Sequence, residues 1–383
     1  MKKDTKRTRG PQSFLGEVGR ALKRLLVFLF ILLLVAGGVG FYYYQTWLRP
    51  RLEEPYATAA LPVRFEVESG QPAARILDNL ERLGLLRDAT VTRYYLVWVM
   101  KDPPLRAGEY EVTRPMAPRE LLDKLIRGDV FVQPLKLIEG LTAFEAVDEM
   151  VKQGFGQRDA FLREIQRVER IADLDPEAKN LEGYLYPDTY LFASKTSEER
   201  VIDALVAGFR KHWQEEVAPL RGPGSFTGSL SVRQLVTLAS IVEKESGKDE
   251  ERPLVASVYA NRLEQGIGLY ADPTIIYAKK LDGTWDGNLR RPDLQMASPY
   301  NTYVVQGLPP GPICSPAVRS LLASVQPADT AFLYFVSKND GTHVFSETLA
   351  EHNRNVDLWQ RQYWQRKWAE ERRALDPASS ERR

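Results

Sequence analysis

The stretch that decides the architecture is LLVFLFILLLVAGGVGFYYY, residues 25–44, which contains no charged side chain. A helix of twenty residues is about 30 Å long, which matches the hydrocarbon core of a bilayer. Three tyrosines close the run and Trp47 follows, as in the aromatic belts of membrane interfaces. Residues 1–24 carry eight basic and two acidic side chains. We therefore expect residues 25–45 to span a membrane, with residues 1–24 cytoplasmic and the rest on the other side.

Two other interpretations of this run are weaker. A cleaved signal peptide has a shorter apolar core and a small-x-small cleavage site, whereas this core is long and ends in bulky aromatic rings. A buried core helix is disfavoured because an uncharged run of this length exceeds what globular cores usually hold.

The composition is that of a globular protein whose positive and negative charges nearly balance. The chain has 383 residues, of which 44% are hydrophobic and 27% charged, and its length suggests about two domains. It has 52 Lys+Arg and 51 Asp+Glu, a net charge of +1, which argues against general nucleic-acid binding. Cys314 is the one cysteine and there are three histidines, so we expect no disulfide framework, no metal site and no cofactor.

A short pattern occurs twice after a proline-containing segment. Residues 46–62 include Pro50, Pro55 and Pro62 and are predicted to be a linker. Residues 70–84 and 140–154 then share flanking glycines and helical spacing, and each follows a strand pattern and precedes a helical stretch. Chance similarity between two amphipathic helices is the alternative. We expect small strand–helix–helix modules over residues 63–155.

The remaining sequence predicts a mixed α+β domain over residues 156–355 and a charged tail over 356–383. Ser231 is expected to cap a long helix, and His343 to pack within its strand. The expected elements, in order, are mostly helix at 157–215 with one loop, helices at 232–246 and 250–265, mostly loop and short strand at 266–316, then a helix and two paired strands.

The helix at 232–246, VRQLVTLASIVEKES, is the best candidate for chemistry. Its apolar residues form one broad arc with Thr237 and Ser240 on the opposite side, and Glu243 projects from the apolar arc. Burial there would raise the pKa of Glu243 toward neutrality, as a proton donor requires. An ion pair with an arginine is the alternative. Glu245, about 200° around the helix, is expected to have a supporting role.

Three polar-aromatic motifs could contact sugars. Asp272-Pro-Thr, Tyr300-Asn-Thr-Tyr303 and Leu308-Pro-Pro-Gly311 offer rings for CH faces and polar groups for hydroxyls, although such motifs are also routine turns. A hydrolase triad of Ser298, His343 and Asp272 is disfavoured, since no nucleophile-elbow pattern is present.

Six motifs together resemble the YceG-like family of endolytic murein transglycosylases, over about residues 60–360. In order they are LEGYLYPDTY (181–190), LASIVEKES (238–246), VASVYANRL (255–263), ADPTIIYA (271–278), SPYNTYVVQGLPPGPICSP (298–316) and YFVSKNDGTHVFSETLAEHN (334–353). Ser246 stands where the family commonly has threonine, which keeps the hydroxyl.

The resemblance implies a membrane-anchored enzyme of the cell (inner) membrane, with LysM-like modules and a catalytic domain outside the cytoplasm. Such an enzyme cleaves the MurNAc–GlcNAc β-1,4 bond of nascent peptidoglycan, leaves 1,6-anhydro-MurNAc ends and terminates glycan polymerisation. The first glutamate of IVEKE, here Glu243, is then the catalytic acid. The residues expected to support it and bind substrate are Asp188, Glu245, Asp272, Tyr300 and Asn301. Glycan polymerases are the implied protein partners.

Two other functions are compatible with the sequence. The chain could be a membrane-anchored glycan-binding scaffold without catalysis, although a scaffold would not need the intact IVEKE stretch. It could also be an ordinary glycosidase that adds water, which would leave reducing ends instead of anhydro ends.

Overall fold

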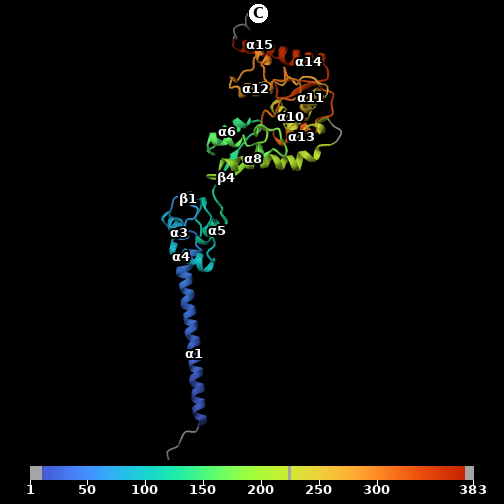
Figure 1. The fold of residues 1–383 in the computed structure, drawn as a ribbon. Coiled ribbons are helices and arrows are strands. Elements are labelled where there is room, and N and C mark those ends of the chain that lie inside the picture. Colours follow the sequence, from blue (N-terminus) through green and yellow to red (C-terminus); the bar gives the residue numbers. More distant parts are fainter. Residues whose placement is uncertain (1–10, 223–225, 376–383) are drawn as a thin grey trace, which may run out of the picture. The chain divides into compact units, whose positions relative to one another are not determined.

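The structure, a computed structural model, describes residues 11–222 and 226–375. It divides into two compact units, one ending at Val132 and one beginning at Gln133 (Figure 1). The elements confirm a mixed α+β fold in which helices dominate and the strands form small two-stranded sheets.

The first unit begins with one long helix. α1 (Pro11–Tyr43) continues through the π-helical turn η1 (Tyr44–Leu48) into α2 (Arg49–Leu52). The segment Leu22–Leu52 is long and apolar enough to cross a membrane. The helix extends into the segment predicted as a linker, and Pro50 lies in the first turn of α2, directly after the π-helical turn.

A small module completes the first unit. Its elements are β1 (Val63–Val67), α3 (Ala73–Arg82), α4 (Ala89–Tyr94), the π-helical turn η2 (Tyr95–Val99), β2 (Gly108–Val112) and α5 (Pro118–Arg127). β1 and β2 are antiparallel, and the rings of Phe65 and Tyr110 stack across the pair at 5.7 Å. Leucines of α3 and α5 pack beneath these rings in a core of the unit's own.

The second unit opens with the same order of elements. They are β3 (Val132–Lys136), α6 (Ala143–Lys152), α7 (Arg158–Glu164), β4 (Thr189–Ala193) and α8 (Glu198–His212), and β3 pairs with β4. Gly70 and Gly140, which precede the matching helices α3 and α6, have the same φ of 77°, which favours glycine. Each predicted copy thus contains a strand followed by two helices, and the second copy lies in the second unit.

Helices form most of the remaining second unit. The longer elements are α9 (Phe226–Ser229), α10 (Val232–Glu245), α11 (Arg252–Glu264), α12 (Asp272–Leu281), α13 (Val318–Val325), β5 (Tyr334–Ser337), β6 (His343–Ser346), α14 (Leu349–Val356) and α15 (Tyr363–Leu375). Short helical turns are η3 (Val168–Arg170), η4 (Trp213–Val217), η5 (Ala218–Leu220), η6 (Asp249–Glu251), η7 (Arg291–Gln295) and η8 (Asp357–Gln362). The predicted antiparallel pairing of the last two strands is confirmed, with Phe335 opposite Phe345.

Two sequence-based expectations differ from the structure here. α12 lies within the segment predicted as loop, because Asp272-Pro273 begins a helix instead of a turn: proline is favoured in the first helical turn. The predicted charged tail is helical to Leu375, and residues 376–383 lie outside the described part of the chain.

α10 is the central helix of the second unit. Its residues Leu235, Val236 and Ala239 belong to one hydrophobic core, while Leu238, Ile241 and Val242 belong to another. Ser231 caps its start, as predicted, with a reciprocal bond from Gln234. The helix is buried on nearly all sides: Thr237 and Ser240, predicted to lie opposite the apolar arc, are also buried and bond to backbone groups.

Candidate active site

Glu243 lies in a buried ion pair. Its Oε1 accepts a hydrogen bond from Arg252 Nη1 at 2.9 Å, and the side chains are only 3% and 9% exposed. Its Oε2 accepts from the Ala317 N–H at 2.9 Å and from the Ser320 hydroxyl at 2.8 Å, both at the start of α13. The carboxylate is an acceptor in every one of these contacts. The geometry is therefore that of the alternative interpretation, an ion pair that holds α10, α11 and α13 together.

Glu245, two residues further toward the end of α10, has a different environment. Its side chain is partly exposed, and among the described residues it forms no ion pair. The hydroxyl of Tyr259, on α11, donates to Oε1 at 3.0 Å. Burial raises the pKa of Glu245 to about 7, and the negative charge of Asp272 adds to this effect, whereas the Tyr259 hydrogen bond and the Arg262 charge oppose it. Glu245 thus has the properties that the sequence analysis assigned to Glu243.

Asp272 belongs to the same charge cluster as Glu245. It is the first residue of α12, and its Oδ1 accepts the hydroxyl of Tyr303 at 2.7 Å. Asp272 is exposed, so its carboxylate is open to a ligand. Arg262, also in the cluster, donates to the carbonyls of Leu333 and Leu269, each at 2.6 Å, and so holds the surrounding loops. The structure brings together Glu245 and Asp272 of the predicted supporting set.

The other predicted residues contact their own loops or neighbouring elements. Asn301 is fully buried, and its amide donates to the carbonyls of Leu294 and Met296 while accepting the N–H of Tyr303. Its polar groups thus organise their own loop. Tyr300 packs its ring 4.9 Å from that of Tyr277 on α12.

Asp188 lies in the loop before β4. It is exposed, and its side chain accepts the N–H of Thr189 at 2.6 Å, while its carbonyl accepts the N–H of Leu137. These contacts join Asp188 to the β3–β4 region, and neither Thr189 nor Leu137 belongs to the Glu245 cluster.

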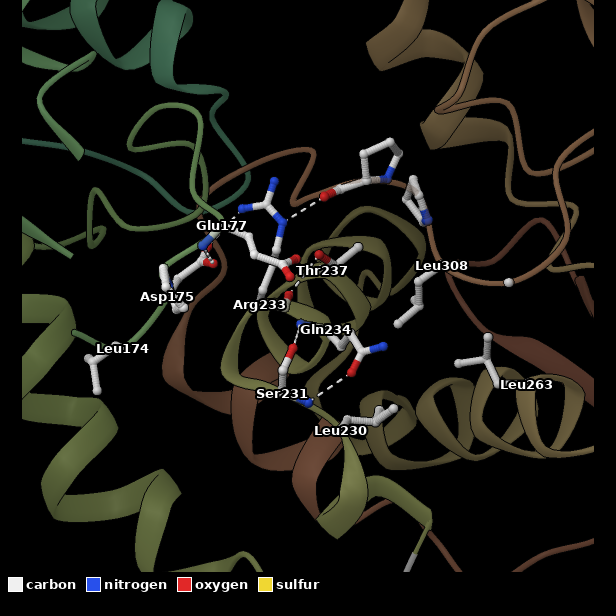
Figure 2. Close-up of a pocket in the computed structure, with 14 residues that line it drawn as sticks. Leu174, Asp175, Glu177, Leu230, Ser231, Arg233, Gln234, Thr237, Leu263 and Leu308 are labelled. Atoms are coloured by element: carbon white, nitrogen blue, oxygen red, sulfur yellow. Dashed lines mark hydrogen bonds and ion pairs between the residues drawn. The ribbon is translucent and has the colours of Figure 1, made fainter. Parts of the chain in front are cut away.

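A large cavity of the second unit lies at the opposite end of α10 from Glu245. It has a volume of about 660 Å³ and is lined by Ser231, Arg233 and the loop that contains Leu308 (Figure 2). Arg233 is already occupied, since it donates to Asp175 at 2.7 Å and to the Pro310 carbonyl at 2.6 Å. The chemistry of the acidic cluster and the size of this cavity therefore point to different places, and we give the carboxyl groups more weight because they can move a proton.

A second groove follows α12. A cavity of about 500 Å³ between α6 and α12 shares Thr142, Tyr277 and Lys280 with a smaller one of about 100 Å³. The smaller cavity is also lined by Lys244 and Pro273, which are the chain neighbours of Glu245 and Asp272. An aromatic side chain, Trp285, lines the far part of the larger cavity. Polar, charged and aromatic groups thus line this groove along α12, and neither Glu245 nor Asp272 is among the residues that line these two cavities.

Several residues of this region were not predicted. Tyr259 and Arg262 lie one turn apart in the VASVYANRL motif, but nothing in their spacing shows that α11 packs against the end of α10. Glu182 is buried, accepts the Ala143 N–H and the Tyr277 hydroxyl, and has its pKa raised by burial to about 8. Within residues 11–222 and 226–375, no group of three or more His, Cys, Asp or Glu side chains is placed to hold a metal ion.

Comparison with known proteins assigns the chain to a family. Residues 65–358 match the YceG-like family. The chain belongs to this family. This YceG-like chain is 29% identical over 337 residues to a Bacillus subtilis (strain 168) protein named endolytic murein transglycosylase. The aligned residues cover 84% of this chain and 90% of that relative. The resemblance stated from the six motifs is therefore confirmed.

Further relatives of this YceG-like chain agree. A Streptococcus pneumoniae (serotype 2, strain D39) protein with the same name is 29% identical over 362 residues, which cover 85% of this chain and 63% of that relative. The crystal structure of a putative yceG-like protein from Listeria monocytogenes aligns with a TM-score of 0.50 and 29% identity, over 77% of this chain and 99% of that one.

Proposed function

We propose that the chain is a membrane-anchored lytic transglycosylase that cuts within nascent peptidoglycan strands at the MurNAc–GlcNAc β-1,4 bond. The names of the relatives support the reaction class and the substrate. The observation that carries the proposal is Glu245, a partly exposed carboxyl group without a cationic partner among the described residues, whose pKa is raised to about 7. Such a group is protonated often enough near neutral pH to act as a general acid.

In this proposal the proton donor is Glu245, not the first glutamate of IVEKE. Glu243 accepts hydrogen bonds from a guanidinium, a backbone N–H and a hydroxyl, so both of its oxygens are occupied within the protein. Its role is to position the end of α10. The proposal thus differs from the sequence-based prediction by two residues on the same helix, because the prediction considered the burial of Glu243 without its partner Arg252.

The reaction needs one carboxyl group. Protonated Glu245 gives its proton to the departing GlcNAc O4 as the C1–O4 bond breaks, and positive charge develops at C1 of MurNAc. The carboxylate then takes the proton of the C6 hydroxyl as O6 bonds to C1. The product is a 1,6-anhydro sugar and no water is consumed, so the second carboxylate of ordinary glycosidases is not required.

The surrounding residues have roles that fit this chemistry. The Tyr259 hydroxyl, kept protonated by burial, orients the Glu245 carboxyl group. Asp272, which remains exposed, lies where a negative charge can stabilise the positive C1 centre. The groove along α12, with Tyr277, Lys280 and Trp285, supplies the surface for neighbouring sugars.

The long N-terminal helix supplies the anchor in this proposal. Its apolar segment would cross the inner membrane with residues 1–24 in the cytoplasm, since the basic residues precede it. The module of residues 63–132 and its repeat in the second unit would be LysM-like glycan-binding parts, and residues 156–355 the catalytic domain. Termination of strands made by glycan polymerases is the biological role that follows from a cut within nascent strands.

The test is a digestion of uncrosslinked glycan by the full-length protein in detergent, with products weighed by mass spectrometry. Wild type should release products lighter by one water than reducing-end fragments. Glu245→Gln should lose activity by about 10²–10⁴-fold, the usual contribution of a general acid. Circular dichroism confirms that each variant is folded.

Three outcomes would count against the proposal. Reducing ends would indicate an ordinary glycosidase, and binding without any cleavage would indicate a scaffold. Full activity of folded Glu245→Gln, together with loss in folded Glu243→Gln, would return the proton donor to the position predicted from sequence.

A further inference from the structure

Exposed aromatic and apolar side chains form a patch at the end of α4. We define the α4–η2 patch as Tyr94, Val97, Trp98 and Val99. Trp98 is 73% exposed and Tyr94 is 64% exposed, although both rings are large and apolar. Single exposed apolar residues are ordinary, but four within six positions on one face of a small module mark an interaction surface.

The α4–η2 patch lies beside the end of the long N-terminal helix. Arg51 of α2 forms an ion pair with Asp88 at 3.6 Å, and Asp88 caps α4 by accepting the Val91 N–H at 2.9 Å. Tyr95, the first residue of η2, lies near enough to Tyr44 to act on it electrostatically. Within the first unit, Figure 1 shows α4 next to the end of α1, whereas β1 is farther along.

Tyr44 marks the level at which the apolar run ends. The uncharged stretch of residues 25–44 ends there, and Trp47 follows on the same helix with Arg51 over its ring at 4.4 Å. If that stretch occupies the bilayer core, as in the proposed function, this level is the membrane–water interface. Tyrosine and tryptophan favour that region, because their rings are apolar while their polar atoms bond to headgroups and water.

The charges around the patch suit the same surface. Arg93 and Lys101 are exposed on either side of it. Basic residues near a bilayer surface are attracted to anionic lipid headgroups by about 1 kcal/mol each. An aromatic-apolar face with basic neighbours is the composition of segments that lie in a membrane interface.

We propose that the α4–η2 patch is a second membrane contact, which inserts into the lipid interface beside the transmembrane helix and holds the first unit against the bilayer. The occupant is lipid, because the patch continues the aromatic level at which the helix leaves the apolar run. The inference rests on the membrane anchoring in the proposed function but not on its catalytic part.

The test uses full-length protein reconstituted in vesicles of phosphatidylethanolamine and phosphatidylglycerol, with a fluorescent label on one introduced cysteine. Val99→Cys reports on the patch and leaves Tyr94 and Trp98 in place. Ser69→Cys, in the exposed loop after β1, is the matched control, and Val35→Cys in α1 reports on the anchor. The native Cys314 is fully buried and burial raises the pKa of its thiol, so it should remain unlabelled.

Quenching by nitroxide-labelled lipids gives the depth of each label. The label at 99 should be quenched by a headgroup-level nitroxide, the label at 35 by a deep one, and the label at 69 by neither. Adding Tyr94→Ser and Trp98→Ser to Val99→Cys should reduce the quenching to the level of the control. All of these side chains are exposed, so the variants should keep the fold, which circular dichroism verifies.

The outcomes separate this inference from the anchor itself. An unquenched label at 99 beside a quenched label at 35 would overturn the patch and leave the anchor intact. An unquenched label at 35 would overturn both. A label at 99 that ignores lipid but is shielded when soluble glycan is added would show that the patch binds sugar, and would also overturn the inference.

Discussion

At the scale of single residues, the proton affinity of Glu245 is set by the groups around it in the acidic cluster. The charge of Asp272 raises the pKa of Glu245, and the Tyr259 hydrogen bond lowers it. Activity that depends on protonated Glu245 should therefore fall as pH rises through about 7. The pH at which activity is halved is thus a direct readout of the cluster.

Two substitutions should move this limit in opposite directions. Asp272→Asn removes a negative charge, so the pKa of Glu245 should fall and the alkaline limit of activity should move to lower pH. Tyr259→Phe removes a donor to the carboxylate, so the limit should move to higher pH. The measurement is the pH profile of glycan cleavage for wild type and both variants. Shifts of the same sign in the two variants would contradict the assignment of Glu245.

Glu182 should make the stability of the second unit depend on pH. Burial raises its pKa to about 8, so between about pH 4.5 and 8 the folded state holds a proton that the unfolded state has released. The free energy of unfolding should therefore decrease as pH rises through this window. Glu182→Gln should flatten that decrease in urea titrations, while the two proteins should respond alike at more acidic pH. An unchanged slope would show that Glu182 is ionised in the fold.

At the scale of elements, one ion pair joins three helices around the site. Glu243 on α10 meets Arg252 on α11 and the first turn of α13, while Arg252 also donates to Ser320 of α13 and to Asp249 at 3.0 Å. All of these groups converge next to the end of α10 that carries Glu245. The position of the proposed acid therefore depends on the Glu243–Arg252 ion pair.

Removing one partner of the Glu243–Arg252 ion pair should destabilise the second unit. Glu243→Met leaves the guanidinium buried without its main partner, for which we expect a loss of about 3–5 kcal/mol in the free energy of unfolding. Combining it with Arg252→Met should cost less than the sum of the two single losses, since neither charge is then left alone. Urea unfolding of the four proteins gives this cycle. Simple additivity would show that the two side chains do not stabilise each other.

At the scale of the whole molecule, the two units have separate hydrophobic cores and should unfold separately. Leu80 belongs to the core of the first unit and Leu205 to that of the second, and both are fully buried. Leu80→Ala should lower the unfolding free energy of the first unit by about 2–5 kcal/mol. In calorimetry the unfolding temperature of that unit should fall, while the transition of the second unit should not move. Leu205→Ala should do the reverse. A single transition that both variants shift equally would show that the units unfold together.

Features that depend on neighbouring residues were predictable from the sequence. The apolar run, the cap at Ser231, the repeated glycine-flanked helices and the paired strands near the C-terminus all follow from local pattern. α12 was missed although its Asp272-Pro273 start is also a local signal, because the same dipeptide is common in turns. The order of motifs also identified the family.

The sequence by itself determined the membrane-length apolar segment and the YceG-like family, and it indicated α10 as the candidate helix for the acid. Only the tertiary structure shows how the surroundings of the two glutamates of that helix differ. Arg252 is nine residues away from Glu243, and Ala317 is 74 residues away, yet both bond to its carboxylate. A carboxyl group's proton affinity is set by the charges and donors that surround it in space, and helical periodicity shows which side of a helix is buried but not what is buried against it.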